Sequence, residues 1–356
     1  MKDIVYLLHW NEGAKSGVFQ KVTQQVMAWC DQGERVSVHV ISAGDLDAEW
    51  RRHLPEIPVF FYRYHGLSSR LKAWRRAIGQ IIRQSPDLVY FRYDLYMPGM
   101  ERLMRQSLVV VEINTDDVRE FCLGLTPRCY YNRLTRSKIL GKAAGMVFVT
   151  HELAESPHFA SFAKPHCVIA NGVRLDSIPQ LPPSLSDHPR LVFMGTEGQP
   201  WHGVDKVLWL AAQLPEWRFD LVGIHTATAS ANVFLHGVLG ESDYRRILSQ
   251  ADVAIGTLAL HRIGMHEACP LKTRAYLASG LPVIIGYRDT DFPDGAPFLL
   301  QLPNAERNVA SHLDEIKAFV AAWQGKRVQR TDIQHLDVGV KEAQRLAFFE
   351  RIVRAA

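Results

Sequence analysis

One segment of the chain combines an acidic residue, a lysine and the start of a helix, a combination that could bind an anion. It runs Glu267-Ala-Cys-Pro-Leu-Lys-Thr-Arg-Ala-Tyr-Leu-Ala-Ser-Gly-Leu-Pro-Val-Ile284, between apolar runs at 252–257 and 281–286. Its first proline can begin a helix with Lys272 in the first turn, and Gly280-Leu-Pro can end that helix. At the N-terminus of a helix, the free backbone N–H groups and the positive end of the dipole attract an anion, and Lys272 adds a full positive charge at the same place. We interpret the segment as a pocket for the diphosphate of an activated sugar.

The size and composition of the chain indicate a two-domain globular protein. A length of 356 residues is enough for two cores, and 47% hydrophobic and 22% charged residues are ordinary values. The net charge of +4 is too small to indicate nucleic acid as a partner. No run approaches the ~20 apolar residues that span a bilayer, and the N-terminal apolar run fits a first strand better than a signal peptide.

The cysteines are odd in number and lack CxxC spacing, which argues against a disulfide framework or a zinc site and for a reducing cytoplasm. They are Cys30, Cys122, Cys129, Cys167 and Cys269.

Basic residues are concentrated between positions 51 and 83. Within this stretch, residues 69–83 predict a helix with apolar residues on one face and cations on the other. The simpler interpretation is a helix packed on a sheet with a solvated basic face. A compatible alternative is that this face lies on an anionic membrane leaflet. The cations are Arg51, Arg52, Arg63, Arg70, Lys72, Arg75, Arg76 and Arg83.

Strand and helix patterns alternate along the whole chain, which is typical of parallel sheets covered by helices. In the first half, a helix over 17–30 has Val18, Val22, Val26 and Trp29 on one face, and Ser16 could cap it. The strands predicted in this half are 4–8, 35–41, 59–64, 88–92, 108–113, 146–150 and 167–170.

A polar, proline-rich stretch then separates a second alternating half. We therefore predict an α/β protein with an N-terminal domain (1–173 plus the C-terminal helix 341–356), a linker (174–189) and a second domain (190–340). Two doubly wound halves leave a cleft at the carboxyl ends of their strands, where open sheets bind ligands. The second half has predicted strands at 191–194, 219–222, 233–235, 253–256, 282–285 and 297–300, and helices at 204–214, 242–249 and 309–323.

The order of short motifs resembles that of the retaining, nucleotide-sugar-dependent glycosyltransferases of the GT-B fold, close to glycosyltransferase family 4 and its bacterial polysaccharide members. The motifs span nearly the whole chain: Gly17-Val-Phe-Gln-Lys-Val22, Val168-Ile-Ala-Asn-Gly-Val173, Phe193-Met-Gly195, His202-Gly-Val-Asp205, His236-Gly237, Ala251-Asp-Val-Ala254 and 267–284. The resemblance implies two Rossmann-like domains facing a cleft, with the C-terminal helix packing back toward the first. It also implies transfer of a sugar from a nucleoside-diphosphate donor to a glycan or lipid-linked acceptor, in cell-surface polysaccharide synthesis. Such an enzyme would be cytoplasmic, and possible contact with the inner membrane face follows from the basic stretch.

The resemblance places the donor site in the second half. The acidic motif of the family has two glutamates eight positions apart, and the first falls on Glu267, which implies contact with the donor sugar and support of charge at its anomeric carbon. The second falls on Ala275, which cannot hold the ribose hydroxyls as the family glutamate does. Loss of such a bond would weaken donor binding about ten- to a hundred-fold. The helix start adds Leu271 and Thr273, and Tyr276 either packs beside the nucleotide or belongs to the core.

The loop after Gly195 also departs from the family pattern. An arginine and a lysine usual there are replaced by Thr196 and His202, beside Gly203. We therefore expect Lys272 to neutralise most of the phosphate charge, with His202 second, either as neutral imidazole or as imidazolium. Trp201 could stack on a base or serve only as packing. The bare backbone of Gly17 would join Lys272 at the leaving diphosphate, which itself takes the proton of the acceptor, so that charge stabilisation supplies most of the catalysis.

Polar residues that follow strands of the first half are candidates for acceptor binding. Asn114 or Asp116 could stand in for a family histidine that contacts the donor sugar. The other candidates are Arg92, Asp94, His9 and Glu12. For each of them the alternative is loop capping or solvent-exposed pairing.

Asp289-Thr-Asp291 could hold a divalent ion on a diphosphate, but its position after a strand end favours a plain turn. We expect no metal and no cofactor beyond the sugar nucleotide. Two rival functions stay open: a catalytically weak or silent GT-B protein that binds nucleotide or glycan, because of Ala275, and a sugar-nucleotide epimerase. A dinucleotide dehydrogenase is not expected, since no Gly-x-Gly-x-x-Gly follows the first strand.

Overall fold

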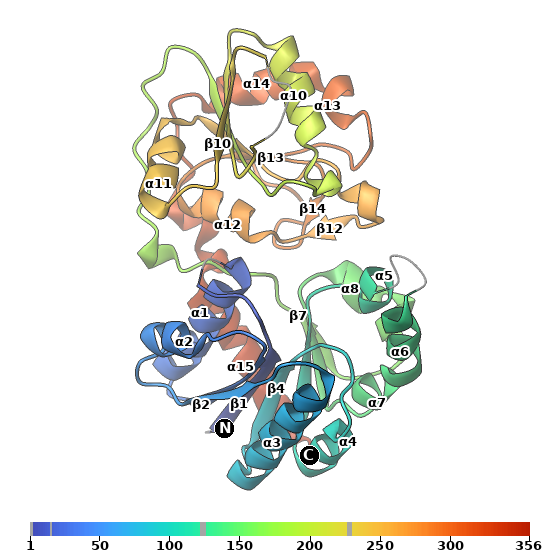
Figure 1. The fold of residues 1–356 in the computed structure, drawn as a ribbon. Helices are drawn as coiled ribbons and strands as arrows, with labels where there is room; N and C mark the ends of the chain where they lie inside the picture. The colour runs from blue at the N-terminus through green and yellow to red at the C-terminus, as the bar shows by residue number, and fades with distance from the viewer. Residues whose placement is uncertain (1–2, 15, 122–125, 226–229) are drawn as a thin grey trace. The chain divides into compact units, whose positions relative to one another are not determined.

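The computed structural model describes residues 3–14, 16–121, 126–225 and 230–356. The chain divides into two compact units: unit 1 is Met1–Ala170 with Val338–Ala356, and unit 2 is Asn171–Asp337. Each unit has its own parallel sheet covered by helices (Figure 1), as the α/β prediction requires. The stretch 174–189, predicted as a linker, packs on unit 2: Gln180 donates to the Val328 carbonyl (2.8 Å) and Ser184 to that of Gln250 (3.2 Å).

The sheet of unit 1 has seven parallel strands in the order β3-β2-β1-β4-β5-β6-β7. The direction of winding reverses between β1 and β4, and ligands bind at such a reversal in open α/β sheets. The strands are β1 (Asp3–His9), β2 (Arg35–Ser42), β3 (Val59–Arg63), β4 (Leu88–Arg92), β5 (Val109–Ile113), β6 (Gly145–Phe148) and β7 (His166–Val168).

The predicted strands of unit 1 are present within two residues, but several short helices escaped prediction. They have too few residues to show a clear apolar period. The helices of unit 1 are α1 (Gly17–Asp31), α2 (Asp47–His53), α3 (Leu67–Gln84), α4 (Met100–Gln106), α5 (Asp117–Phe121), α6 (Pro127–Thr135), α7 (Ser137–Leu140), α8 (His151–Glu155), α9 (Pro157–Ala160) and α15 (Val338–Arg354).

Helix α1 packs its apolar face, including Val22, Val26 and Trp29, into the core of unit 1. Ser16 precedes it in an extended conformation, but its hydroxyl makes no capping hydrogen bond, so the predicted side-chain cap is wrong. The Trp29 indole N–H donates to Glu342 of α15 at 2.8 Å. This bond ties the last helix of the chain to the first.

The C-terminal helix α15 completes the core of unit 1, as predicted. Phe348 and Phe349 are buried in that core. Arg345 is also buried and donates to Glu342 (2.7 Å) and to the Tyr90 hydroxyl (2.6 Å). A buried charge needs such partners, because an unpaired one would be strongly destabilising.

The sheet of unit 2 has six parallel strands in the order β10-β9-β8-β11-β13-β15, and its winding reverses between β8 and β11. Two further residue pairs form a short parallel ladder of β12 (Glu267–Ala268) with β14 (Arg288–Asp289). The six strands are β8 (Arg190–Met194), β9 (Arg218–Val222), β10 (Val233–Gly237), β11 (Val253–Ile255), β13 (Val283–Ile285) and β15 (Leu299–Gln301).

The single helix predicted at 309–323 is interrupted at His312, whose backbone is not helical (φ −126°, ψ 29°). The result is two helices, α13 and α14. The helices of unit 2 are α10 (Val204–Gln213), α11 (Glu241–Gln250), α12 (Leu271–Ala278), α13 (Asn308–Ser311) and α14 (Leu313–Trp323), with 3₁₀ turns η1 (Leu175–Ser177), η2 (Pro200–His202), η3 (Leu260–Ile263) and η4 (Arg330–Leu336).

The cysteines differ from expectation at one position. Cys30, Cys167 and Cys269 are free. Cys129 is disulfide-bonded, a bond that the sequence did not predict. Cys122 also lies outside the described residues.

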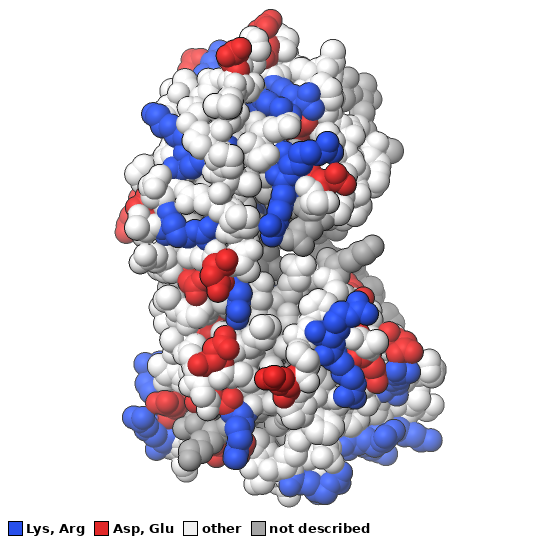
Figure 2. Space-filling model, turned by 90° about the vertical axis from the view of Figure 1, so that its left-hand side faces the viewer, with Lys and Arg blue, Asp and Glu red and all other residues white. Residues whose placement is uncertain are grey.

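Within the basic stretch 51–83, the predicted amphipathic helix 69–83 lies in α3, with Trp74, Ile78 and Ile81 buried. Some of its cations are paired within unit 1: Arg63 contacts Asp45 and Asp47, and Arg70 contacts Asp94. On the face seen in Figure 2, basic and acidic side chains are interspersed and form no continuous basic patch. Among the described residues, no helix combines the length and the hydropathy that a membrane crossing requires.

Candidate functional site

Lys272 lies in the first turn of α12, close to the end of β8. Its ammonium donates to the Met194 carbonyl at 3.2 Å and lies 4.9 Å from the centroid of the Phe193 ring. Burial lowers the pKa of Lys272 to about 7, because the charged form is poorly solvated there. A lysine near its pKa at a helix N-terminus is suited to an incoming phosphate, which would restore its charge.

The loop after β8 carries His202 toward the same place. The Nδ1 atom of His202 accepts a hydrogen bond from the Thr196 amide (3.3 Å). Burial, together with the charge of Lys272, lowers the pKa of His202 to about 4. Of the two ionisation states considered from the sequence, the neutral imidazole is therefore the one present at neutral pH. Gly203 has φ +74° and precedes α10, so its backbone conformation favours glycine.

Two loops approach each other closely at the carboxyl edge of the unit 2 sheet. Gly223, after β9, has φ +80°, and a Cβ atom there would lie 2.1 Å from the Gly195 carbonyl oxygen. Only glycine allows this contact. The Gly195 amide in turn donates to the Val222 carbonyl at 3.0 Å. The close approach keeps the loop after β8 against the sheet edge.

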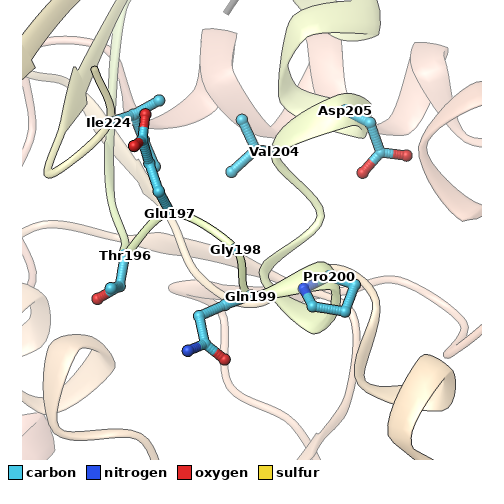
Figure 3. Close-up of a pocket in the computed structure, with 8 residues that line it drawn as sticks. All are labelled: Thr196, Glu197, Gly198, Gln199, Pro200, Val204, Asp205 and Ile224. Carbon is cyan, nitrogen blue, oxygen red and sulfur yellow. The ribbon is translucent and has the colours of Figure 1, made fainter. Parts of the chain in front are cut away.

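A pocket of about 490 Å³ opens beside this loop at the start of α10. In Figure 3, Glu197 lies next to Ile224, and Asp205 extends from α10 on the opposite side. Glu197 accepts a hydrogen bond from the His225 amide (2.7 Å), and Asp205 is paired with Arg262 (2.7 Å). The pocket is lined by Thr196, Glu197, Gly198, Gln199, Pro200, Val204, Asp205 and Ile224.

Glu267 belongs to the two-residue strand β12 that leads into α12, and only 1% of its surface is exposed. Arg288 of β14 donates to its carboxylate at 3.1 Å. A buried and paired carboxylate is held in a fixed orientation.

The other predicted donor residues of α12 lie at different depths. Tyr276 is fully buried, and its hydroxyl accepts a hydrogen bond from the Met194 amide (2.7 Å), which fits its alternative interpretation as core. Thr273 is also fully buried and shares a hydrogen bond with the Tyr287 hydroxyl (2.8 Å). Leu271 and Ala275 are half-buried. Tyr276 therefore supports the strand end that Lys272 also contacts.

Asp289 and Asp291, the candidate metal pair, are both engaged by Arg274 of α12. Arg274 is fully buried and donates to Asp289 (2.7 and 2.8 Å) and to Asp291 (2.9 Å). The same arginine donates to the Asn171 carbonyl at 3.1 Å. Across the described residues no cluster of three or more His, Cys, Asp or Glu side chains could hold a metal ion. The two aspartates thus hold α12 in place.

In unit 1, the structure brings His9 and Asp94 together where the winding reverses between β1 and β4. Nδ1 of His9 lies 2.6 Å from the Asp94 carboxylate, and Nε2 lies 2.7 Å from the Tyr64 hydroxyl. Arg70 is 3.2 Å from the same carboxylate. Burial alone would raise the pKa of Asp94, but the hydrogen bond and charge of His9, with Arg70, lower it.

Arg92 and Asn114 belong to a second, buried group around Glu112 of β5. Glu112 is 1% exposed and is paired with Lys21 (2.9 Å) and Arg92 (3.2 Å). Lys21 also donates to Asn114 at 2.7 Å. Burial disfavours the charged form of Glu112, but Lys21 and Arg92 together hold its pKa well below the usual range. These contacts fix the loop after β5.

The remaining predicted residues of unit 1 lie apart from these groups. Asp116 accepts from the Val118 amide (3.1 Å) at the start of α5 and contacts His158 (3.0 Å), which matches the loop-capping alternative. Glu12 is exposed, and Gly17 is exposed as the first residue of α1.

Sequence reasoning missed several members of these groups. Arg70 was counted only as part of a basic surface, although it points at Asp94. Tyr64 is the last residue of the predicted strand 59–64, and its position at a strand end was the available signal. Glu197 stands two residues after Gly195 in a loop already singled out, but no pattern distinguishes it from a solvent-exposed glutamate.

The fold of the whole chain is similar to that of GT-B glycosyltransferases. Sucrose-phosphate synthase from Thermosynechococcus elongatus matches it with a TM-score of 0.72 and 16% identity, over 100% of both chains. Anabaena Alr3699/HepE, solved in complex with UDP and glucose, matches with a TM-score of 0.62 and 14% identity, over 97% of this chain and 99% of the other. At these identities the likeness shows the fold, and the chain has the two-domain GT-B architecture.

The same fold also occurs in a protein of another function class. A chain from Listeria monocytogenes, assigned as a UDP-N-acetylglucosamine 2-epimerase, matches with a TM-score of 0.57 and 14% identity, over 99% of this chain and 97% of the other. No protein-family profile matches the chain, and no curated protein matches it. The choice between functions therefore depends on the site.

Proposed function

We propose that this protein is a retaining glycosyltransferase of the family 4 type, which moves a sugar from a nucleoside-diphosphate donor to a glycan or lipid-linked acceptor. The observation that carries the proposal is the position of Lys272, in the first turn of α12 and against the end of β8. Helix N-terminus, cationic side chain and winding reversal coincide there, which suits a diphosphate. The GT-B fold, shared with HepE in its complex with UDP and glucose, supports this choice of ligand.

In the proposed reaction, the donor diphosphate binds in unit 2, at Lys272, the N-terminus of α12 and the loop from Gly195 to Gly203. Neutral His202 donates one hydrogen bond to a phosphate oxygen. Glu267 holds sugar hydroxyls and supports positive charge at the anomeric carbon. As the bond from this carbon to the diphosphate breaks, the leaving diphosphate takes the proton of the acceptor hydroxyl on the same face of the sugar. Stabilisation of the leaving charge supplies most of the rate.

The acceptor is assigned to unit 1, at the edge where His9 and Asp94 meet. Both are hydrogen-bonded and half-buried, so they can present fixed polar atoms to a hydroxyl group. We place the reaction in cell-surface polysaccharide synthesis, in the cytoplasm and at the inner membrane face. No metal or cofactor is required, because Lys272 supplies the charge that a metal would bring to the diphosphate.

Ala275 supports the alternative of a weak or silent binding protein, since a carboxylate that would hold the ribose is absent from α12. The Ala275→Glu variant separates the two possibilities. If this variant gains sugar transfer or donor hydrolysis, the natural chain is a weakened enzyme. If the variant shows neither activity, the chain is a binding protein. The second alternative is a sugar-nucleotide epimerase, because the Listeria chain assigned to that function has a similar fold. An epimerase would convert the donor without any acceptor.

A thermal-shift panel of nucleoside diphosphates and their sugars tests the proposal directly. A ligand at about 100 times its Kd stabilises a protein by ~2.7 kcal/mol. We expect one nucleotide base to give the largest shift, both as the diphosphate and as its sugar. Stabilisation by none of these compounds at millimolar concentration contradicts the proposed function.

A further inference from the structure

The neighbouring ends of β4 and β5 in unit 1 carry more positive than negative charge. The buried carboxylate of Glu112 lies 2.9 Å from the ammonium of Lys21 and 3.2 Å from the guanidinium of Arg92. Arg345, a further cation of this region, is already paired with Glu342 at 2.7 Å. One carboxylate thus faces two cations, which leaves an excess of one positive charge at these strand ends.

The ionisation of Lys21 reflects this excess. Burial lowers the pKa of Lys21, and Glu112 opposes this effect. The charges of Arg92 and Arg345 lower the same pKa further, because like charges repel. An anion bound beside Arg92 would offset this repulsion and favour the charged form of Lys21.

Asn114, directly after β5, has its side-chain amide oriented by the same lysine. An ammonium can only donate hydrogen bonds, so the atom of Asn114 that lies 2.7 Å from Lys21 Nζ is the carbonyl oxygen Oδ1. The Nδ2 group is then left as a donor, and within the described part of the chain it donates to no other residue. Asn114 is half-buried, so a ligand can reach this donor.

Arg92, the last residue of β4, has N–H donors to spare beside Asn114. Its side chain is 15% exposed. Nη1 donates to Glu112 at 3.2 Å, and a guanidinium has five N–H groups, so others remain for a ligand. In the sheet Arg92 pairs in register with Glu112, which stands two positions before Asn114. The donors of Arg92 and Asn114 therefore belong to one edge of the sheet.

We propose that Arg92 and Asn114 bind an anionic group of the acceptor, which is the carboxylate of an acidic sugar or a phosphate. N–H donors beside an uncompensated positive charge suit an oxygen that only accepts hydrogen bonds. A neutral hydroxyl group would use the donors but would leave the charge excess in place. Asp94, two positions after Arg92, does not oppose this ligand, because it is paired with His9 (2.6 Å) and Arg70 (3.2 Å).

The inference rests on the proposed function in one respect, since it names the chemical class of the acceptor. Arg92 and Asp94 are close along the chain, so one acceptor can place a hydroxyl group at His9 and its anionic group at Arg92. Binding of an acidic sugar needs no donor. Failure of this binding therefore leaves transfer to a neutral acceptor standing, whereas failure of the nucleotide panel leaves the anion site standing.

Titration of the full-length chain with three sugars, followed by ligand-observed NMR, tests the inference. Methyl glucoside and methyl glucuronide differ only at the last carbon, where the second sugar has a carboxylate, and methyl glucoside 6-phosphate has a phosphate at the same carbon. We expect at least one anionic sugar to bind about ten- to a hundred-fold more tightly than the neutral one. The tighter of the two identifies the source of the anion. Equal affinities for all three sugars, or no binding of any, overturn the inference.

Two variants locate the site. Arg92→Met removes the guanidinium but leaves Glu112 paired with Lys21. Asn114→Asp replaces the N–H donor by a carboxylate of the same shape, with which Lys21 can still pair. Each variant should reduce the preference for the anionic sugar about tenfold or more. Thermal unfolding of each variant shows that the fold is intact.

The matched controls make the same changes elsewhere at the strand ends of unit 1. Arg63→Met removes an arginine that ends β3, and Asn11→Asp changes an exposed asparagine that follows β1. Both controls should keep the preference for the anionic sugar. The inference is wrong if Arg92→Met and Asn114→Asp keep that preference, or if the controls lose it to the same extent.

Discussion

His9 and Asp94, 85 positions apart in the sequence, lie 2.6 Å apart in unit 1. His9 is the last residue of β1, and Asp94 comes two residues after β4. The two residues meet because β1 and β4 are neighbours in the sheet, at the point where the winding reverses. Arg70 and Tyr64 complete the group from outside these two strands. In unit 2 the winding reverses between β8 and β11, and Lys272 of α12 contacts the end of β8 there.

The first prediction concerns acceptor binding by this group. In the His9→Ala variant, kcat/KM for the acceptor should fall about ten- to a hundred-fold, because a hydrogen bond to the acceptor is lost and Asp94 keeps only Arg70. Affinity for the nucleoside diphosphate, measured by calorimetry, should stay unchanged, since the donor is assigned to unit 2. The control is His166→Ala, an exposed histidine of β7. An equal loss in acceptor kinetics and nucleotide affinity would falsify the assignment.

The second prediction is a pH dependence of donor affinity. The pKa of Lys272 is lowered to about 7, so the unliganded lysine loses its charge as pH rises above 7. Affinity for the diphosphate should then fall with rising pH, by at most about tenfold per pH unit. Because the terminal phosphate of the ligand titrates near pH 6, the relevant quantity is the difference between wild type and Lys272→Met, in which the lysine contribution is gone.

The stability of the unliganded protein should change with pH in the opposite direction. Above pH 7 the unfolded state binds more protons at Lys272 than the folded state, so this residue contributes stability that increases from pH 7 toward 10.5. Urea unfolding of wild type and Lys272→Met at several pH values measures the contribution. The lowered pKa of Lys272 predicts that, as pH rises above 7, its contribution to stability increases while its contribution to donor affinity decreases. If both contributions changed in the same direction, this explanation would be wrong.

The two halves of the fold illustrate what the sequence could and could not predict. Buried parallel strands such as β1 and β4 are nearly continuous apolar runs, and the stripe of Val22, Val26 and Trp29 is unambiguous for a helix. The short helices α5 to α9 have only four to nine residues each, and their positions depend on tertiary packing. For the site, the sequence offered polar residues after strands as candidates, but it could not state which of them touch.

The partnership of Arg274 with Asp289 and Asp291 is one such contact. In the sequence, Asp289 and Asp291 suggested a turn or a metal pair, and Arg274 suggested nothing. A sequence gives no spacing rule for a salt bridge between a helix and a following loop. Tyr276 was left open between nucleotide and core for the same reason, and its contact with the Met194 amide places it in the core.

The third prediction concerns the stability of unit 2. Arg274→Met should destabilise the protein by about 3–5 kcal/mol, because the buried carboxylate of Asp289 would lose the arginine that neutralises it. Urea unfolding measures the loss. The matched control is Arg246→Met, which removes an exposed arginine of unit 2 from the exposed Asp243 and should cost far less. Equal losses in both variants would show that burial of the arginine is not what matters.

The fourth prediction concerns metal ions. Because Asp289 and Asp291 are already bound by Arg274, they should not hold a divalent cation on the donor. Donor turnover in excess chelator should match turnover without it. Recovery of lost activity by added Mg²⁺ or Mn²⁺ would contradict this expectation and return the pair to the site.

Turnover of the sugar nucleotide by Lys272→Met, beside its thermal stability, tests the proposed function most directly. Lys272 is assigned to the charge on the leaving diphosphate, so turnover should fall by about a hundredfold or more, while the melting temperature stays within a few degrees of wild type. Near-normal turnover in a stably folded variant would show that the phosphate clamp lies elsewhere, and the proposed mechanism of transfer would then be wrong.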